Sequence, residues 1–179
     1  LVYFIAAFVG APFWSWLAGR LGKHRALAVN SLFIVASLFA VLLIPFTSLL
    51  VGALVMAAVG LPYSGGSLLL RAMLADVGDE MRLDSGVDRT GLLYAVLTGT
   101  TKIGYALATA TFVILEALGF KATAAHNSAA SLLGLQALFV GLPSVLALLA
   151  AWIILRYRLD AGRHAEIRAA LDRQDAART

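Results

Sequence analysis

The chain has no cysteine and few charges, with Asp, Glu, Lys and Arg making up 13% of its 179 residues. The missing cysteine excludes disulfide scaffolds and thiolate metal sites. The three histidines are far apart in sequence and have no ligand spacing, so no metal site is predicted. Neither a Ser/His/Asp arrangement nor a glycine-rich phosphate loop after a strand occurs, so we predict no catalytic residues, no bound cofactor and no enzyme activity. Nucleic acid is not an expected partner.

The sequence is instead strongly apolar, with 61% hydrophobic residues and a mean hydropathy of +0.88. Several runs exceed about 18 residues with few charges, which is long enough to cross a bilayer. We therefore predict an all-α polytopic membrane protein of about five transmembrane helices. The predicted spans are Leu1–Ala18, Ala26–Ile44, Ser48–Ala75, Gly91–Phe120 and Ser131–Leu155.

Two further features refine this division of the chain. At about 28 residues the third span is longer than a bilayer requires, so a kink is predicted at the Gly- and Pro-rich residues 60–66. Residues 1–158 are predicted to form the transmembrane bundle, and residues 159–179 a polar cytoplasmic tail. The tail is expected to be a partly frayed, solvated helix with Ile167 and Leu171 on one side.

The positions of Lys and Arg predict the orientation in the membrane. With five spans, the first loop, the third loop and the tail lie on one side, and these segments carry nearly all the basic residues outside the spans: Arg20, Lys23, Arg25, Arg82, Arg89, Arg156, Arg158, Arg163, Arg168, Arg173 and Arg178. The opposite loops offer only Lys121. Because cytoplasmic loops are enriched in basic residues, these segments and the C-terminus are predicted to be cytoplasmic. Near this side, Trp14, Trp16 and Trp152 are expected to form an interfacial aromatic belt.

Lys102 is the residue that most needs an explanation. It lies about 11 residues, or about 17 Å, into the fourth predicted span, near the centre of a hydrocarbon layer about 30 Å thick. A charge at that depth costs several kcal/mol or more unless it meets a counter-charge or water. We therefore predict that Lys102 faces a cavity. Residues at helical spacing along the same stripe are Tyr94, Thr98, Tyr105 and Thr109.

The alternative is a lysine neutralised by packing, with threonines that bond only to their own helix. None of the chain's acids lies at the depth of Lys102, since Glu116 is about 21 Å further along the same helix. A partner carboxylate is therefore expected on sequence outside this chain. The first residue is Leu1 within an apolar run, which also indicates a piece of a longer protein.

A group of acids follows the third span. Asp76, Asp79 and Glu80 are spaced by three and four residues, so a continued helix would place their carboxylates on one face. They are predicted either to pair with Arg82, Arg89 or a basic loop as a conformational latch, or to be solvated interfacial charges.

Three motifs in order resemble the glycoside–pentoside–hexuronide:cation symporters, the melibiose-permease branch of the major facilitator superfamily. They are the run from Ala75 to Glu80 with its Asp-x-x-Asp pattern, the run from Arg89 to Tyr94, and Lys102, eight residues after Tyr94. The tryptophan- and arginine-containing run Trp14–Arg25 is similar to the family's loop between helices eight and nine, except that Gly19 stands where the superfamily often has an acid.

The resemblance implies helices eight to twelve of a twelve-helix transporter, that is, its C-terminal half. It implies a cation-coupled symporter for a sugar or sugar-like solute in a bacterial plasma membrane, with Na⁺ or H⁺ bound mainly by the missing N-terminal half. Lys102 would then reach the central cavity, and Asp76, Asp79 and Arg89 would belong to a cytoplasmic gate. The alternative is a small, non-transporting helical scaffold or complex subunit. The expected partners are membrane lipid, a small solute and the other half of the transporter.

Overall fold

The computed structural model describes residues 1–43, 48–124, 126–157 and 159–177, and every regular element in these ranges is helical. The elements run along the chain as follows: α1 (Val2–Leu21), α2 (Lys23–Leu43), α3 (Leu49–Gly60), α4 (Tyr63–Ser85), α5 (Thr90–Ala117), α6 (Ala129–Gln136), the π-helical turn η1 (Ala137–Gly141), α7 (Leu142–Ile154) and α8 (Ala161–Ala176). The prediction of an all-α chain is confirmed. The predicted ends at Ile44 and residue 158, with Arg158, Arg178 and Thr179, lie outside the described residues.

Four helical stretches among the described residues are long and apolar enough to cross a membrane: Val2–Leu21, Lys23–Leu43, Leu49–Ser85 and Ala129–Ile154. They correspond to the first, second, third and fifth predicted spans, so the polytopic membrane character is confirmed. The helix of the fourth predicted span, α5, has 28 residues but does not meet the same standard of apolarity. Lys102 and four threonines in its central part lower its hydropathy.

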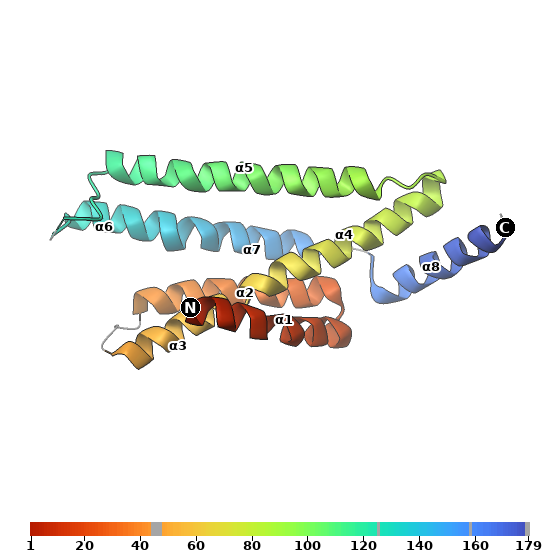
Figure 1. Cartoon of the computed structure of the whole chain (residues 1–179), viewed down its shortest axis with the longest axis horizontal. Helices are drawn as coiled ribbons and strands as arrows, with labels where there is room; N and C mark the ends of the chain where they lie inside the picture. The colour runs from red at the N-terminus through yellow and green to blue at the C-terminus, as the bar shows by residue number, and fades with distance from the viewer. Residues whose placement is uncertain (44–47, 125, 158, 178–179) are drawn as a thin grey trace.

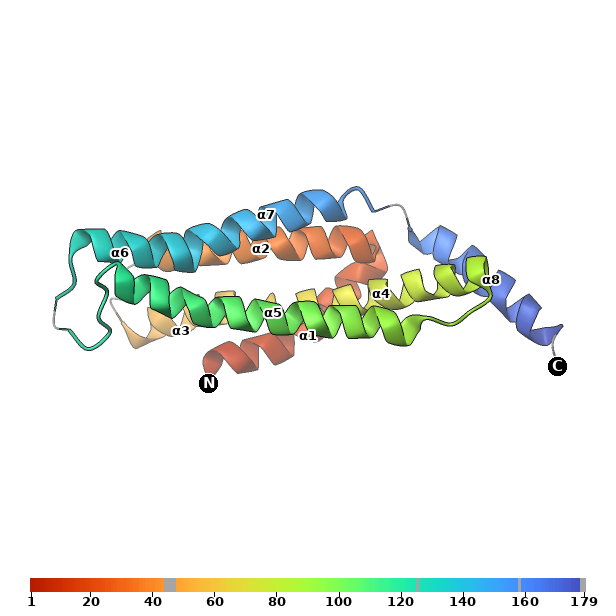
Figure 2. The ribbon, with the colours of Figure 1, turned by 90° about the horizontal axis from the view of Figure 1, so that it is seen from above.

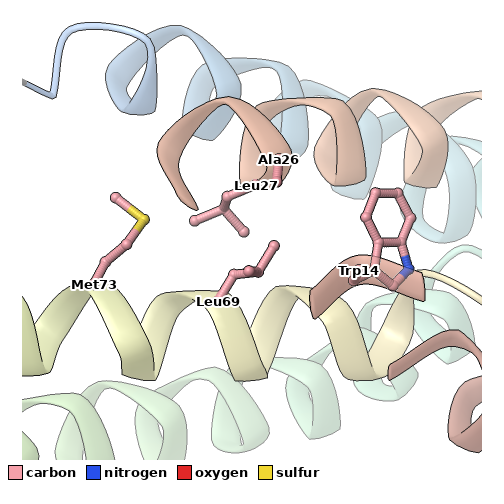
Figure 3. Close-up of a cluster of buried hydrophobic side chains, with 5 residues drawn as sticks. All are labelled: Trp14, Ala26, Leu27, Leu69 and Met73. Carbon is pink, nitrogen blue, oxygen red and sulfur yellow. The ribbon is translucent and has the colours of Figure 1, made fainter. Parts of the chain in front are cut away.

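The helices form an elongated bundle, with α8 projecting beyond one end (Figures 1 and 2). α2 packs against α1, α4 and α7, and α1 also packs against α3 and α4. In the core near the α1–α2 turn, Leu69 and Met73 of α4 point towards Ala26 and Leu27 of α2 (Figure 3). Trp14 belongs to this cluster and is 1% exposed. Its predicted place in an interfacial belt is therefore wrong, because its indole fills the junction of α1, α2 and α4.

Trp16 and Trp152 differ from Trp14 because both are exposed at helix ends. The guanidinium of Arg20 lies 5.0 Å from the Trp16 ring centroid, and that of Arg156 lies 3.7 Å from the Trp152 centroid. Such cation–π contacts suit an interface where one side of the ring is apolar and the other is wet.

The kink predicted in the long third span is present. α3 ends at Gly60 and α4 begins at Tyr63, with Leu61 and Pro62 between them. Pro62 has no N–H to continue the helical ladder, so the chain bends here. The fifth predicted span is one continuous helical stretch, α6–η1–α7, whose π turn ends at Gly141, two residues before Pro143.

The tail differs from expectation. Residues Ala161–Ala176 form α8, which is docked on α4 instead of being solvated. Asp160 caps its first turn by accepting a hydrogen bond from the Arg163 amide at 2.8 Å. Ile167 and Leu171 are 1% and 2% exposed and pack with Val77 and Leu83. Burial of this i, i+4 apolar pair, about 2 kcal/mol per side chain, holds the tail helix in place.

Candidate functional site

Among the described residues, α5, the helix that carries Lys102, packs against α4 near its start and against α6 near its end. Its first turn lies against Gly78 of α4 through Thr90, and the Tyr94 hydroxyl donates to the Arg71 carbonyl at 3.3 Å. At the other end, Leu118 just beyond α5 contacts Gly134 of α6. The side chains of residues 98–110 are exposed on every face of the helix.

Lys102 lies in the middle of this exposed segment. No acid among the described residues forms an ion pair with it. Gly99 and Gly104 on either side have nothing within 4 Å of where a Cβ would stand, so the backbone is open to close approach. A ligand or helix that packs against this part of α5 would therefore meet the Lys102 ammonium and backbone left uncovered at Gly99 and Gly104.

The residues predicted to share a stripe with Lys102 do not form a closed site within the described residues. Tyr105 is 68% exposed. The Thr109 hydroxyl donates to the Tyr105 carbonyl at 3.1 Å, and Thr100 and Thr101 also bond to carbonyls of their own helix. These bonds fit the alternative prediction, in which the threonines bond only to carbonyls of their own helix. Thr98 is exposed on the same stripe as Lys102. For both residues, a place in the lining of the central cavity stays a prediction.

A second polar group lies where α4 leaves the bundle. The Lys23 ammonium, at the start of α2, lies 2.7 Å from both carboxylate oxygens of Asp76, whose side chain is 9% exposed. A carboxylate so nearly buried needs a partner that is both charged and hydrogen bonding. Lys23 supplies both, so the turn between α1 and α2 is tied to α4.

α8 completes this group. His164 Nε2 lies 3.2 Å from Asp76 Oδ1 and 3.2 Å from Asp79 Oδ2, and Arg168 Nη1 lies 3.5 Å from Asp79 Oδ1. We call Lys23, Asp76, Asp79, His164 and Arg168 the α4–α8 cluster. Two acids one turn apart on α4 thus meet two basic residues one turn apart on α8. A further pair, Arg82 with Asp175 at 2.7 Å, fixes the far end of α8.

A cavity of about 340 Å³ adjoins the cluster. It is lined by Lys23 and His24 from the start of α2, Asp76 from α4 and His164 from α8, with Gly19 and Gly22 at the α1–α2 turn. Its lining holds charges of both signs, and the basic groups nearest Asp76 are already bonded to that acid.

Tyr157 lies beneath the cluster, just after α7. Burial, with the negative charges of Asp76 and Glu80, raises the pKa of the Tyr157 phenol to about 12. Its hydroxyl donates to the Met73 carbonyl at 3.4 Å, so both burial and this hydrogen bond favour the neutral form.

The sequence predicted the acids of this group but not all their partners. Asp76 and Asp79 share one face of α4, as their spacing predicted, and Lys23 comes from the basic first loop. Arg89 does not join them, because it is exposed at the start of α5 and forms no ion pair with another described residue. His164 and Arg168 were missed. Their i, i+4 spacing, beside buried Ile167, is about one helical turn, as is the i, i+3 spacing of Asp76 and Asp79, and this likeness is the signal that could have identified them.

Comparison with known proteins decides the family. The sequence model of the family described as MFS/sugar transport protein matches residues 1–161. The chain belongs to this family. MFS denotes the major facilitator superfamily, so the predicted superfamily is confirmed, and the family is one of transporters and not of enzymes.

Curated relatives agree with this assignment. The chain is 30% identical over 176 residues to a sphingosine-1-phosphate transporter MFSD2B from Xenopus tropicalis, covering 96% of the chain and 34% of the relative. It is 26% and 28% identical to the sodium-dependent lysophosphatidylcholine symporters 1-B and 1-A from Danio rerio, covering 89% and 91% of the chain. The chain spans about a third of the length of these relatives, since it covers 31% of each symporter. This member of the MFS/sugar transport family is therefore an integral membrane protein that contacts lipid.

Proposed function

We propose that this chain is the C-terminal half, helices eight to twelve, of a cation-coupled secondary transporter. The two halves of such a transporter rock around a site near the membrane midplane, so that the site opens to each side in turn. The family match supports a transporter, and two relatives named as sodium-dependent support coupling to a cation. Na⁺ or H⁺ would bind mainly to the other half.

The observation that carries this proposal is the position of Lys102 on the exposed middle of α5. An ammonium at this depth does not face acyl chains unless several kcal/mol are supplied elsewhere. The stripe of α5 that carries Lys102, Tyr94, Thr98 and Tyr105 therefore faces a water-containing cavity. An acid on the other half would pair with Lys102, and competition between that pair, the coupling cation and the solute would bias which side opens.

Two classes of solute follow from the observations. The resemblance to the symporter branch, together with the family's own description, favours a sugar or sugar-like solute. The relatives' names favour a phosphate-bearing lipid with a single chain. For the second class, Lys102 would bind the phosphate, while exposed Ile103, the next residue of α5, would contact the chain.

The α4–α8 cluster serves as a gate element in this proposal. The basic loops and the C-terminus lie in the cytoplasm, in keeping with the distribution of Lys and Arg. The Lys23–Asp76 pair then holds one arrangement of α1, α2 and α4 at the cytoplasmic face. A bacterial plasma membrane remains a prediction from the resemblance alone.

Transport by the full-length protein in proteoliposomes tests the proposal. Uptake of a panel of labelled glycosides, lysophosphatidylcholine and sphingosine-1-phosphate is measured with and without an inward sodium gradient. We expect gradient-driven uptake of one class, and loss of nearly all of it in Lys102→Leu, while membrane insertion is unchanged.

Lys121→Leu is the matched control, because it removes the same charge from the loop after α5 and should leave uptake intact. Unchanged uptake in Lys102→Leu would refute the assigned role of Lys102. No uptake of any solute by the intact protein under either condition would instead favour a non-transporting helical scaffold.

A further inference from the structure

The bend between α3 and α4 is bonded to two neighbouring helices. In an unbroken helix the carbonyl of Ala58 would accept from the N–H of residue 62, but that residue is proline and has none. The carbonyls of Leu61 and Pro62 also lie at the bend, between the last residue of α3 and the first of α4. The Pro62 carbonyl accepts a bond from the Gly66 amide at 3.3 Å. In the interior of a membrane protein, carbonyls left without a helical partner require donors from elsewhere in the protein.

Each of these three carbonyls receives a hydrogen bond from a different side chain. The Ser37 hydroxyl shares its one proton between the Ala58 carbonyl at 3.1 Å and the Phe33 carbonyl of its own helix at 2.7 Å. Trp14 Nε1 donates to Leu61 at 2.9 Å, and Asn30 Nδ2 donates to Pro62 at 2.9 Å. The three donors are 5%, 1% and 0% exposed, respectively. Trp14 lies on α1, and Asn30 and Ser37 lie on α2, so two neighbouring helices donate hydrogen bonds to the bend.

Glycines bring the backbones close enough for these bonds. A Cβ on Gly10 of α1 would collide with the Leu61 carbonyl oxygen, and one on Gly60 would collide with the Tyr3 carbonyl. A Cβ on Gly65 would collide with the Trp14 ring. α1 therefore lies directly against the bend, which leaves no room for α3 and α4 to change their angle past it.

We propose that Trp14, Asn30 and Ser37 are positioning residues that fix the α3–α4 bend, so that α1, α2 and α4 move as one rigid body. Asp76 lies about 21 Å beyond Pro62 along α4, so a change of about 10° in the bend moves its carboxylate by about 4 Å. That movement would break the 2.7 Å contact with Lys23. The role of this rigid body in transport rests on the proposed function, whereas the fixed bend itself does not.

Distance measurement between spin labels across the bend tests the proposal. The labels are placed on Leu54→Cys in α3 and Asp84→Cys in α4, both exposed, in full-length protein whose only cysteines are these two. The test variants are Ser37→Ala and Asn30→Leu. The matched control is Ser31→Ala, because Ser31 is a buried serine of α2 that donates only to Leu27 of its own helix, at 3.0 Å.

We expect one narrow distance distribution in the parent and in Ser31→Ala. Both test variants should give a broader distribution shifted to longer distances, because an unlocked bend straightens. A distribution in Ser37→Ala that is unchanged from the parent would overturn the proposal, and this variant decides the matter if Asn30→Leu does not yield monodisperse protein. The measurement needs no solute, so its outcome is independent of whether the transport assay succeeds.

Discussion

At the scale of single residues, the molecule places its charges in two different environments. Asp76 is nearly buried yet fully bonded, by Lys23 at 2.7 Å and His164 at 3.2 Å. Lys102 is exposed and unpaired among the described residues. The charges of the α4–α8 cluster are therefore paired with one another within this chain. Lys102 needs a partner from outside, which is why we assign the solute site to it and a holding role to Asp76.

Tyr157 gives a prediction about alkaline pH. Its pKa is raised to about 12 in the folded protein, against 10.0 for an ordinary tyrosine. Between these values the unfolded chain releases the phenolic proton while the folded chain keeps it, so the free energy of unfolding falls as pH rises. Below pH 10 both states are protonated and this contribution is constant. Thermal unfolding of the purified protein, followed from pH 9 to 11.5, should show this loss.

Tyr157→Phe cannot ionise, so its unfolding temperature should fall less steeply over that range than that of the parent. Tyr105→Phe is the control, since Tyr105 is exposed on α5 and its replacement should leave the slope of the parent unchanged. Parallel curves for the parent and Tyr157→Phe would show that this phenol is not held neutral by its surroundings.

At the scale of elements, α8 shows where prediction from the sequence fell short. Its arginines and alanines are typical of a solvated helix, and only two apolar residues, Ile167 and Leu171, interrupt the polar pattern. Their partners, Val77 and Leu83, lie about 90 residues earlier on α4. Local spacing predicts that two such residues share a face, but it carries no information about which distant helix covers that face.

The bend between α3 and α4 was easier to predict because its cause is local. Pro62 and the glycines around it specify a break without reference to any other helix. The donors that satisfy the break lie on α1 and α2. The sequence therefore predicts that a bend exists, whereas its fixed angle and the burial of Trp14 depend on tertiary packing.

The docking of α8 leads to a prediction at this scale. Ile167→Ala removes a side chain that is 1% exposed and should weaken docking by about 2–4 kcal/mol through lost burial and the cavity left behind. Amide hydrogen exchange across residues 161–176 should then become faster, while exchange in α2 stays slow. Glu166→Ala, one residue earlier on an exposed face, should change exchange by little. Equal protection of α8 in Ile167→Ala and the parent would mean that the ion pairs alone hold the helix.

At the scale of the whole molecule, the chain is a bundle with one long helix left open. α2, α1 and α4 form the packed part, and α5 runs along one edge (Figure 1), packed against α4 near its start and α6 near its end. A helix with both a lysine and many apolar side chains exposed is not stable against lipid alone. In the proposed function, a second half of the transporter would cover α5 and enclose the solute route.

The sequence accounted for the class of protein and for most of its spans, because apolar run length follows directly from bilayer thickness. It also singled out Lys102 by depth alone. The surroundings of Lys102 were not predictable, because local spacing does not specify what covers the exposed residues 98–110 of α5. The solute was not predictable either, because the same fold carries many substrates.

The most direct test of the central claim is the environment of position 102 in the membrane. In full-length protein with no other cysteine, Lys102→Cys is treated with a membrane-impermeant thiol reagent, and Leu107→Cys, about 140° around the same helix, serves as the control. We expect Lys102→Cys to react and Leu107→Cys to react far more slowly. If Lys102→Cys reacts only with a lipid-soluble reagent, whether or not solute is present, the residue faces the bilayer and the account is contradicted.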